Sequence, residues 1–183
     1  MGEKREARVR SLVAVGILSA LVFVFSWVQV PFGDVARIHL GNGFCALAGL
    51  LFGPVTGGLA SGIGSMLFDL TDPVYIAESP ITFVTKFAIG FVAGCIARRG
   101  APRLMRDVAA AAAGSFAYVA LYLAKSLIVM LYIEGQAFAA VEVQLAAKAA
   151  TSCVNALAAV VIASALAQAM RPALRRAHLL GLG

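Results

Sequence analysis

The chain has 183 residues, of which 61% are hydrophobic and only 13% are Asp, Glu, Lys or Arg, with a formal net charge of +6. An average soluble domain carries roughly 45–50% apolar and about 25% charged residues. This composition excludes intrinsic disorder, which requires few apolar residues and many charges. It also leaves too few polar side chains to cover the surface of a water-soluble domain. The sequence therefore predicts an integral membrane protein from end to end.

The apolar runs predict six membrane-spanning helices. A spanning helix needs about 20 apolar residues, and the run over residues 40–70 is too long for one helix. It is interrupted at Gly53–Pro54, where proline removes a backbone donor, so we divide it there. The predicted spans are residues 11–30, 40–52, 55–70, 81–97, 108–133 and 143–170. Residues 1–183 then form a single six-helix membrane domain with no room for a nucleotide-binding domain.

The basic residues predict how this domain is oriented. With six spans, the N-terminus, the loop over residues 98–106 and the C-terminal tail share one side. These segments hold 11 of the 15 basic residues, namely Lys4, Arg5, Arg8, Arg10, Arg98, Arg99, Arg103, Arg106, Arg171, Arg175 and Arg176. Cytoplasmic loops carry an excess of Lys and Arg. We therefore expect an all-α integral membrane protein with six transmembrane helices and both termini in the cytoplasm.

Four ionisable residues remain inside the predicted spans, and all four lie in the outer halves of their helices: Asp69, Lys86, Lys125 and Lys148. A charge in the bilayer is costly, so such residues face the protein interior, pair with one another or line a site. Each lysine alone could instead extend its ammonium group to the outer interface. One carboxylate against three ammonium groups leaves positive charge unmatched. Our hypothesis is that an anionic substrate compensates this positive charge. The alternative is that glutamates on the outer side compensate it.

Polar side chains accompany these charges at helical spacing, which favours one shared cavity over separate interfacial lysines. They are Ser61 and Ser65 before Asp69, Thr82 and Thr85 beside Lys86, Tyr118 and Tyr122 before Lys125, and Gln144, Thr151 and Asn155 around Lys148. Small residues form a second pattern. Gly16 and Ala20 make a small-xxx-small pair on the first span, and Gly58–Gly62 and Gly90–Gly94 are GxxxG motifs, which let helices approach closely.

Three segments together resemble the substrate-binding (S) components of energy-coupling factor (ECF) vitamin transporters. They are Arg37-Ile-His-Leu-Gly-Asn42, Ala48-Gly-Leu-Leu-Phe-Gly-Pro54 and the glycine-rich stretch that leads to Asp69. The resemblance covers the whole chain. It implies a high-affinity receptor for a vitamin-like micronutrient in a prokaryotic plasma membrane. It also implies a transmembrane coupling subunit and two cytoplasmic ATPase subunits as partners.

The resemblance further implies which residues bind. A ligand pocket is expected at Arg37, His39, Asn42, Glu78, Lys86, Tyr122, Lys125, Lys148 and Asn155, and the charge argument adds Asp69. Gly16 and Ala20 match the small-residue motif with which family members dock on the coupling subunit. The sequence does not identify the substrate, although the three lysines favour one that carries a carboxylate or a phosphate.

Two other classes of function stay open from the sequence. A stand-alone secondary transporter or channel would fit the six spans, although we find no inverted repeat. A small multi-span enzyme would need a catalytic motif, and neither HExxH nor GxSxG is present. The three cysteines lie scattered in apolar runs. We therefore expect no catalytic residues, no cofactor, no metal site and no nucleic-acid partner.

Overall fold

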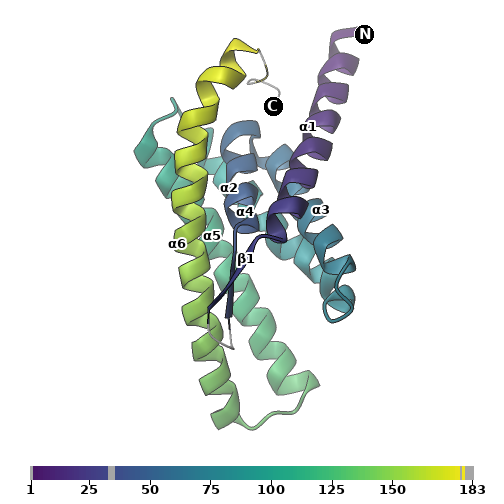
Figure 1. Ribbon diagram of the computed structural model, residues 1–183, viewed down its shortest axis with the longest axis vertical. Coiled ribbons are helices and arrows are strands. Elements are labelled where there is room, and N and C mark those ends of the chain that lie inside the picture. Colours follow the sequence, from purple (N-terminus) through teal and green to yellow (C-terminus); the bar gives the residue numbers. More distant parts are fainter. Residues whose placement is uncertain (1, 33–35, 178, 180–183) are drawn as a thin grey trace.

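The computed structural model describes residues 2–32, 36–177 and 179, and it describes their side chains except at residues 2–4, 7, 30–32 and 36–38. In this part of the chain, six α-helices form a bundle beside one β-hairpin (Figure 1). The elements are α1 (Gly2–Ser26), β1 (Gln29–Phe32), β2 (Ala36–His39), α2 (Gly41–Phe52), α3 (Pro54–Leu70), η1 (Ile76–Glu78), α4 (Ser79–Ala97), α5 (Leu104–Ile128), η2 (Val129–Ile133) and α6 (Phe138–Arg176). The six helices agree with the predicted architecture.

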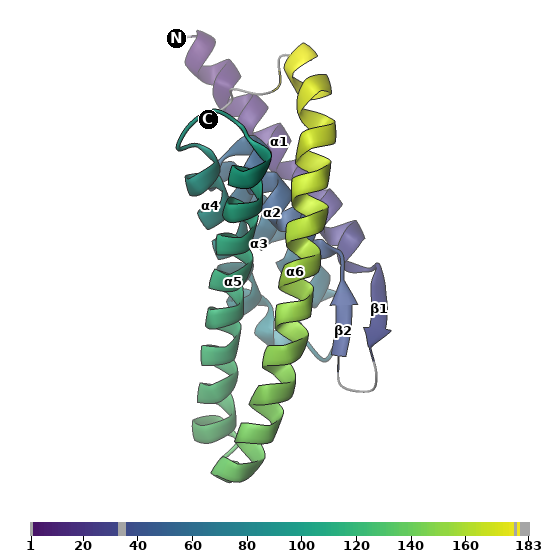
Figure 2. The same ribbon diagram turned by 90° about the vertical axis from the view of Figure 1, so that its left-hand side faces the viewer.

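The bundle has two distinct ends. The start of α1 and the end of α6 lie together, with the α4–α5 connection, at what we call the terminal end (Figure 1). The β-hairpin, the α3–α4 connection and the α5–α6 connection point the other way, and we call this the hairpin end (Figures 1 and 2). The common position of the two helix ends is compatible with termini on one side of a membrane. That this side is the cytoplasmic one stays a prediction.

The β-hairpin was not predicted. The first span was expected to run to residue 30, but α1 ends at Ser26 and the chain turns into β1. β1 and β2 pair antiparallel, with Gln29 opposite His39 and Phe32 opposite Ala36. Apolar residues alternate at Val28, Val30 and Phe32 in this stretch, which is the period of a strand. That local alternation overrides the helical continuation of the apolar run.

Helix α2 lies at the centre of the bundle and is buried along nearly its whole length. It ends at Gly53, which adopts a positive φ of 85° and lets the chain reverse into α3, where the sequence places Gly-Pro. Close backbone packing requires glycine here. A Cβ added to Gly90 of α4 would lie 2.3 Å from the carbonyl oxygen of Gly57 in α3. The second and third small-residue motifs therefore pack within the bundle, so that α2, α3 and α4 sit close together.

Helix lengths bear on the number of membrane crossings. Four helical stretches of the described chain are long and apolar enough to cross a bilayer, namely residues 8–26, 76–97, 104–133 and 138–176. Helix α2 has 12 residues and α3 has 17, so they measure only about 18 and 26 Å at 1.5 Å per residue. Four crossings thus have direct support, and the two further ones stay a prediction.

A buried ion pair holds α5 and α6 together at the terminal end. Arg171 makes a bidentate contact with Asp107, with Nη2 donating to Oδ1 at 2.7 Å and Nη1 donating to Oδ2. Gln168 donates to the same Oδ2 at 2.6 Å. Asp107 is 1% exposed and Arg171 is 8% exposed. The prediction that Arg171 belongs to a basic tail is wrong, because α6 continues to Arg176 and this pairing takes Arg171 into the bundle. We call these three residues the Asp107 cluster.

Candidate functional site

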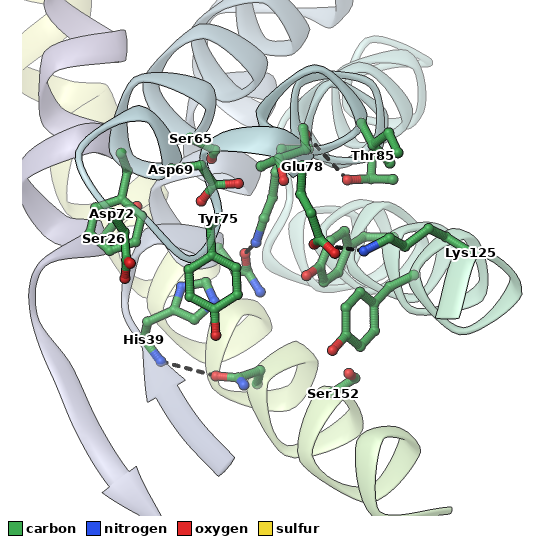
Figure 3. A pocket seen from close by; sticks show the side chains of 18 of the residues that line it. Ser26, His39, Ser65, Asp69, Asp72, Tyr75, Glu78, Thr85, Lys125 and Ser152 are labelled. Carbon is green, nitrogen blue, oxygen red and sulfur yellow. Dashed lines mark hydrogen bonds and ion pairs between the residues drawn. The ribbon is translucent and has the colours of Figure 1, made fainter. Parts of the chain in front are cut away.

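A cavity of about 590 Å³ opens at the hairpin end, and we call it the hairpin-end cavity. Its wall comes from the end of α1, from the hairpin, from α2 to α6 and from the connection between α3 and α4 (Figure 3). Small-molecule pockets commonly have volumes of about 300–1,000 Å³ and a few convergent polar groups. The size and the mixed polar and aromatic lining therefore suit a single vitamin-sized molecule.

The structure places nine of the ten predicted site residues on the wall of this cavity. They are His39, Asn42, Asp69, Glu78, Lys86, Tyr122, Lys125, Lys148 and Asn155. The tenth, Arg37, has its backbone in β2, but its side chain lies outside the described ones. The three lysines thus face one common space. Whether these residues bind a ligand stays a prediction.

Lys86 of α4 is the most deeply placed of the three lysines, at 6% exposure. Its Nζ donates a hydrogen bond to Oδ1 of Asn42, which stands in the first turn of α2. The same ammonium lies 4.1 Å from the ring centroid of Tyr118 on α5, within cation–π distance. Lys86 therefore joins three helices at the inner part of the cavity.

The other two lysines have different partners. Lys125 of α5 forms an ion pair with Glu78, with Nζ and Oε2 2.6 Å apart, across the cavity from the α3–α4 connection (Figure 3). Lys148 of α6 lies 6.0 Å from the ring centroid of Tyr122. Among the described residues, no carboxylate comes within ion-pair distance of Lys148. Lys148 is therefore the wall lysine with the weakest internal compensation.

The carboxylates on the wall change the charge count made from the sequence. Asp69, Asp72 and Glu78 line the cavity together with Lys86, Lys125 and Lys148. Three carboxylates thus face three ammonium groups among the described wall residues, where the sequence argument placed only Asp69 inside. The surplus of positive charge that motivated an anionic ligand is absent from this count.

His39 connects the hairpin to α6 and contributes a neutral ring to the wall. Its backbone N–H donates to Oδ1 of Asn155 at 3.1 Å. Burial, and then the nearby Lys86 ammonium, lower the pKa of His39 from 6.5 to about 3. Its Nδ1 is buried without a hydrogen-bond partner among the described residues. The imidazole is therefore uncharged at neutral pH.

Two of the wall residues that were missed come from a connection rather than from a helix face. Asp72 and Tyr75 belong to the α3–α4 connection, where Asp72 Oδ1 accepts the Val74 N–H at 3.0 Å. Tyr75 projects from the same connection and lines the cavity (Figure 3). Asp72-Pro73 marks a turn in the sequence, but nothing local shows that this turn folds back over the bundle. Ser26, Gln29, Phe68 and Ser152 also line the wall without having been predicted.

One predicted polar residue and the single tryptophan of the chain lie elsewhere. Gln144 stands at the start of the predicted polar stripe on α6, and its Nε2 donates a hydrogen bond to Oε1 of Gln136 at 2.8 Å. It is not among the residues that line the cavity. Trp27 makes edge contacts with Phe23 and Phe68 and also lies off the wall. The stripe on α6 thus reaches the cavity only from Lys148 onward.

An apolar groove runs along α1 and α3 and shares no lining residue with the hairpin-end cavity. We call it the α1 groove, and it is lined by Leu12, Val15, Gly16, Ser19, Ala20, Phe23, Ile63, Leu67, Leu70 and Thr71. Gly16 and Ala20 are exposed. A Cβ added to Gly16 would meet no atom within 4 Å. The predicted docking motif is therefore accessible, and its role in docking stays a prediction.

Comparison with known proteins gives two matches. A family model described as "ECF-type riboflavin transporter, S component" matches residues 6–172. A protein of Lactiplantibacillus plantarum described as "UPF0397 protein" is 41% identical over 71 residues, which are 38% of this chain and 38% of that relative. The second match covers well under two thirds of either chain, whereas the first covers nearly all of this one.

Proposed function

The chain belongs to the family of ECF-type riboflavin transporter S components, and from this premise we propose that it is a high-affinity receptor that binds riboflavin in the hairpin-end cavity. The family makes it a multi-pass membrane component that binds the substrate of a vitamin transporter, and not a member of an enzyme family. The proposal adds the ligand, the cavity and the delivery of the ligand to an ATP-driven transporter. The membrane we propose is a prokaryotic plasma membrane, with the cavity facing outward.

One observation carries the proposal: nine residues expected to bind line one cavity of suitable size. Phe68, Tyr75, Tyr118 and Tyr122 add aromatic surfaces to that wall. Aromatic rings favour offset or edge contacts with planar ring systems. Riboflavin has such a ring and carries no net charge, which suits a wall with equal numbers of described carboxylates and ammonium groups.

An anionic micronutrient remains the second candidate, and Lys148 supports it. This ammonium has no described carboxylate within ion-pair distance. A ligand phosphate or carboxylate placed there would supply one. Flavin mononucleotide separates the two candidates, because it is riboflavin with a phosphate ester at the end of its side chain.

The test is a titration of the purified protein in detergent with each flavin, followed by flavin fluorescence. We expect riboflavin to saturate at one molecule per chain and flavin mononucleotide to bind about tenfold more weakly, because a buried phosphate would lack sufficient compensation. Equal or tighter binding of flavin mononucleotide would favour the anionic candidate. Failure of both flavins to bind would overturn riboflavin as the ligand.

We further propose that a transmembrane coupling subunit and two cytoplasmic ATPase subunits take up the ligand from this receptor, and that the α1 groove contacts the coupling subunit. Gly16→Trp should fill the groove and abolish uptake in cells while riboflavin binding persists. Ile17→Trp is a matched control, because Ile17 is exposed on α1 but is not part of the groove. Retained uptake by Gly16→Trp would mean that docking uses another surface. Uptake by the purified protein alone in liposomes would instead indicate a secondary transporter.

A further inference from the structure

The contact between Lys86 and Asn42 fixes the orientation of the Asn42 side chain. A lysine ammonium only donates hydrogen bonds, so the Asn42 atom that it contacts is the carbonyl oxygen Oδ1. The amide nitrogen of Asn42, with two N–H donors, is then the polar atom left for the cavity. Asn42 is 2% exposed and lies on the cavity wall, so a ligand that fills the cavity meets a donor there.

Asp69 supplies a hydrogen-bond acceptor on the neighbouring part of the cavity wall. It stands near the end of α3, lines the cavity, and lies beside Thr82 and within electrostatic reach of Lys86. Among the described residues it makes no ion pair. An ionised carboxylate accepts hydrogen bonds and cannot donate them, so a ligand meets an acceptor there. Lys86 hydrogen-bonds Asn42 and interacts electrostatically with Asp69, and all three side chains line the same cavity.

We infer that Asn42 and Asp69 select ligands that present a ring carbonyl next to a ring N–H, with Lys86 as the residue that orients the Asn42 amide. The Asn42 amide would donate to the carbonyl, and the Asp69 carboxylate would accept from the N–H. The substrate class is therefore a planar heterocycle with a lactam or imide edge. This inference rests on the proposed function, because the imide edge of riboflavin is the group we assign to this corner of the cavity.

Recognition of this kind gives strong discrimination. A site built to hydrogen-bond a polar group rejects the analogue that lacks it, because its own buried groups are then left unpaired. Asp69 should therefore matter most for ligands that keep the N–H. Asn42 should matter equally for every ligand that keeps the carbonyl.

The experiment compares riboflavin with 3-methylriboflavin, in which a methyl group replaces the imide hydrogen and the carbonyls are kept. For the wild-type protein we expect 3-methylriboflavin to bind about tenfold more weakly or worse, the effect of losing a hydrogen bond to a charged group. Asp69→Ala should weaken riboflavin binding and bring the ratio of the two dissociation constants close to one. Asn42→Asp keeps the shape and the contact with Lys86 but loses the donor, so it should weaken both flavins and keep their ratio.

Asp72→Ala is the matched control, because Asp72 is a second carboxylate on the same wall. It should keep the ratio, whatever its effect on overall affinity. Thermal unfolding in detergent establishes that each variant is folded. Equal binding of the two flavins to the wild-type protein, or an unchanged ratio in Asp69→Ala, would overturn this inference alone. Failure of both flavins to bind would overturn the proposed ligand, and the inference with it.

Discussion

The two ends of the bundle handle buried charge in opposite ways. In the Asp107 cluster, one carboxylate receives donors from Arg171 and Gln168, and little of it remains exposed. At the hairpin end, Lys86 has an amide and an aromatic ring as partners, and Lys148 has no described carboxylate within ion-pair distance. Buried charges persist only when other groups compensate them. The terminal end compensates its buried carboxylate with an ion pair, whereas the hairpin end compensates the Lys86 ammonium with an amide oxygen and an aromatic ring.

Breaking the Asp107 cluster should have the largest effect on stability. Arg171→Met leaves the Asp107 carboxylate buried without its main partner, and we expect the free energy of unfolding to fall by about 3–5 kcal/mol. The measurement is reversible unfolding in mixed micelles. The double variant Asp107→Asn with Arg171→Met should recover much of the loss, because it removes the uncompensated charge. A single variant as stable as the wild type would show that the cluster does not stabilise α5 against α6.

A pH dependence should come from His39. Its pKa in the folded protein, about 3, lies below the value of 6.5 that applies when the chain is unfolded. As the pH falls below 6.5 the unfolded state binds the proton first, so stability drops toward pH 3 by at most about 1.4 kcal/mol per pH unit. Unfolding curves between pH 8 and pH 5 should show a steeper loss for the wild type than for His39→Gln. Parallel curves would mean that His39 takes up its proton equally in both states.

Breaking the ion pair between Lys125 and Glu78 at the hairpin end should lower the free energy of unfolding much less than Arg171→Met does. Lys125→Met removes the partner of Glu78, whose side chain is 43% exposed. Water can solvate the remaining carboxylate, so the loss should stay below about 1 kcal/mol. The same unfolding assay measures it, side by side with Arg171→Met. A loss as large as that of Arg171→Met would erase the distinction between the two ends.

The sequence predicts well what helical periodicity controls. The break at Gly53–Pro54 and the polar stripes on α3 to α6 follow from local residue types. The hairpin was missed because the apolar run hides its short alternation at Val28, Val30 and Phe32. The pairing of Asp107 with Arg171 joins residues 64 positions apart, and no local pattern encodes it.

The candidate site shows the same limit. Charges inside spans identify Lys86, Lys125 and Lys148 because lone charges are rare there. Their partners depend on how distant elements fold together, so the sequence named Glu78 as a pocket residue without assigning it to Lys125. The contribution of Tyr75 and Asp72 depends on the α3–α4 connection folding over the cavity, which a turn signal alone does not indicate.

The central claim is that one small molecule occupies the hairpin-end cavity, and native mass spectrometry after incubation with riboflavin tests it most directly. Ser152→Trp should fill the cavity that Ser152 lines on α6 (Figure 3). Val154→Trp places the same bulk two residues away on an exposed position of that helix. We predict a one-to-one adduct for the wild type and Val154→Trp and none for Ser152→Trp. An adduct that persists in Ser152→Trp, or is absent from the wild type, would contradict the account.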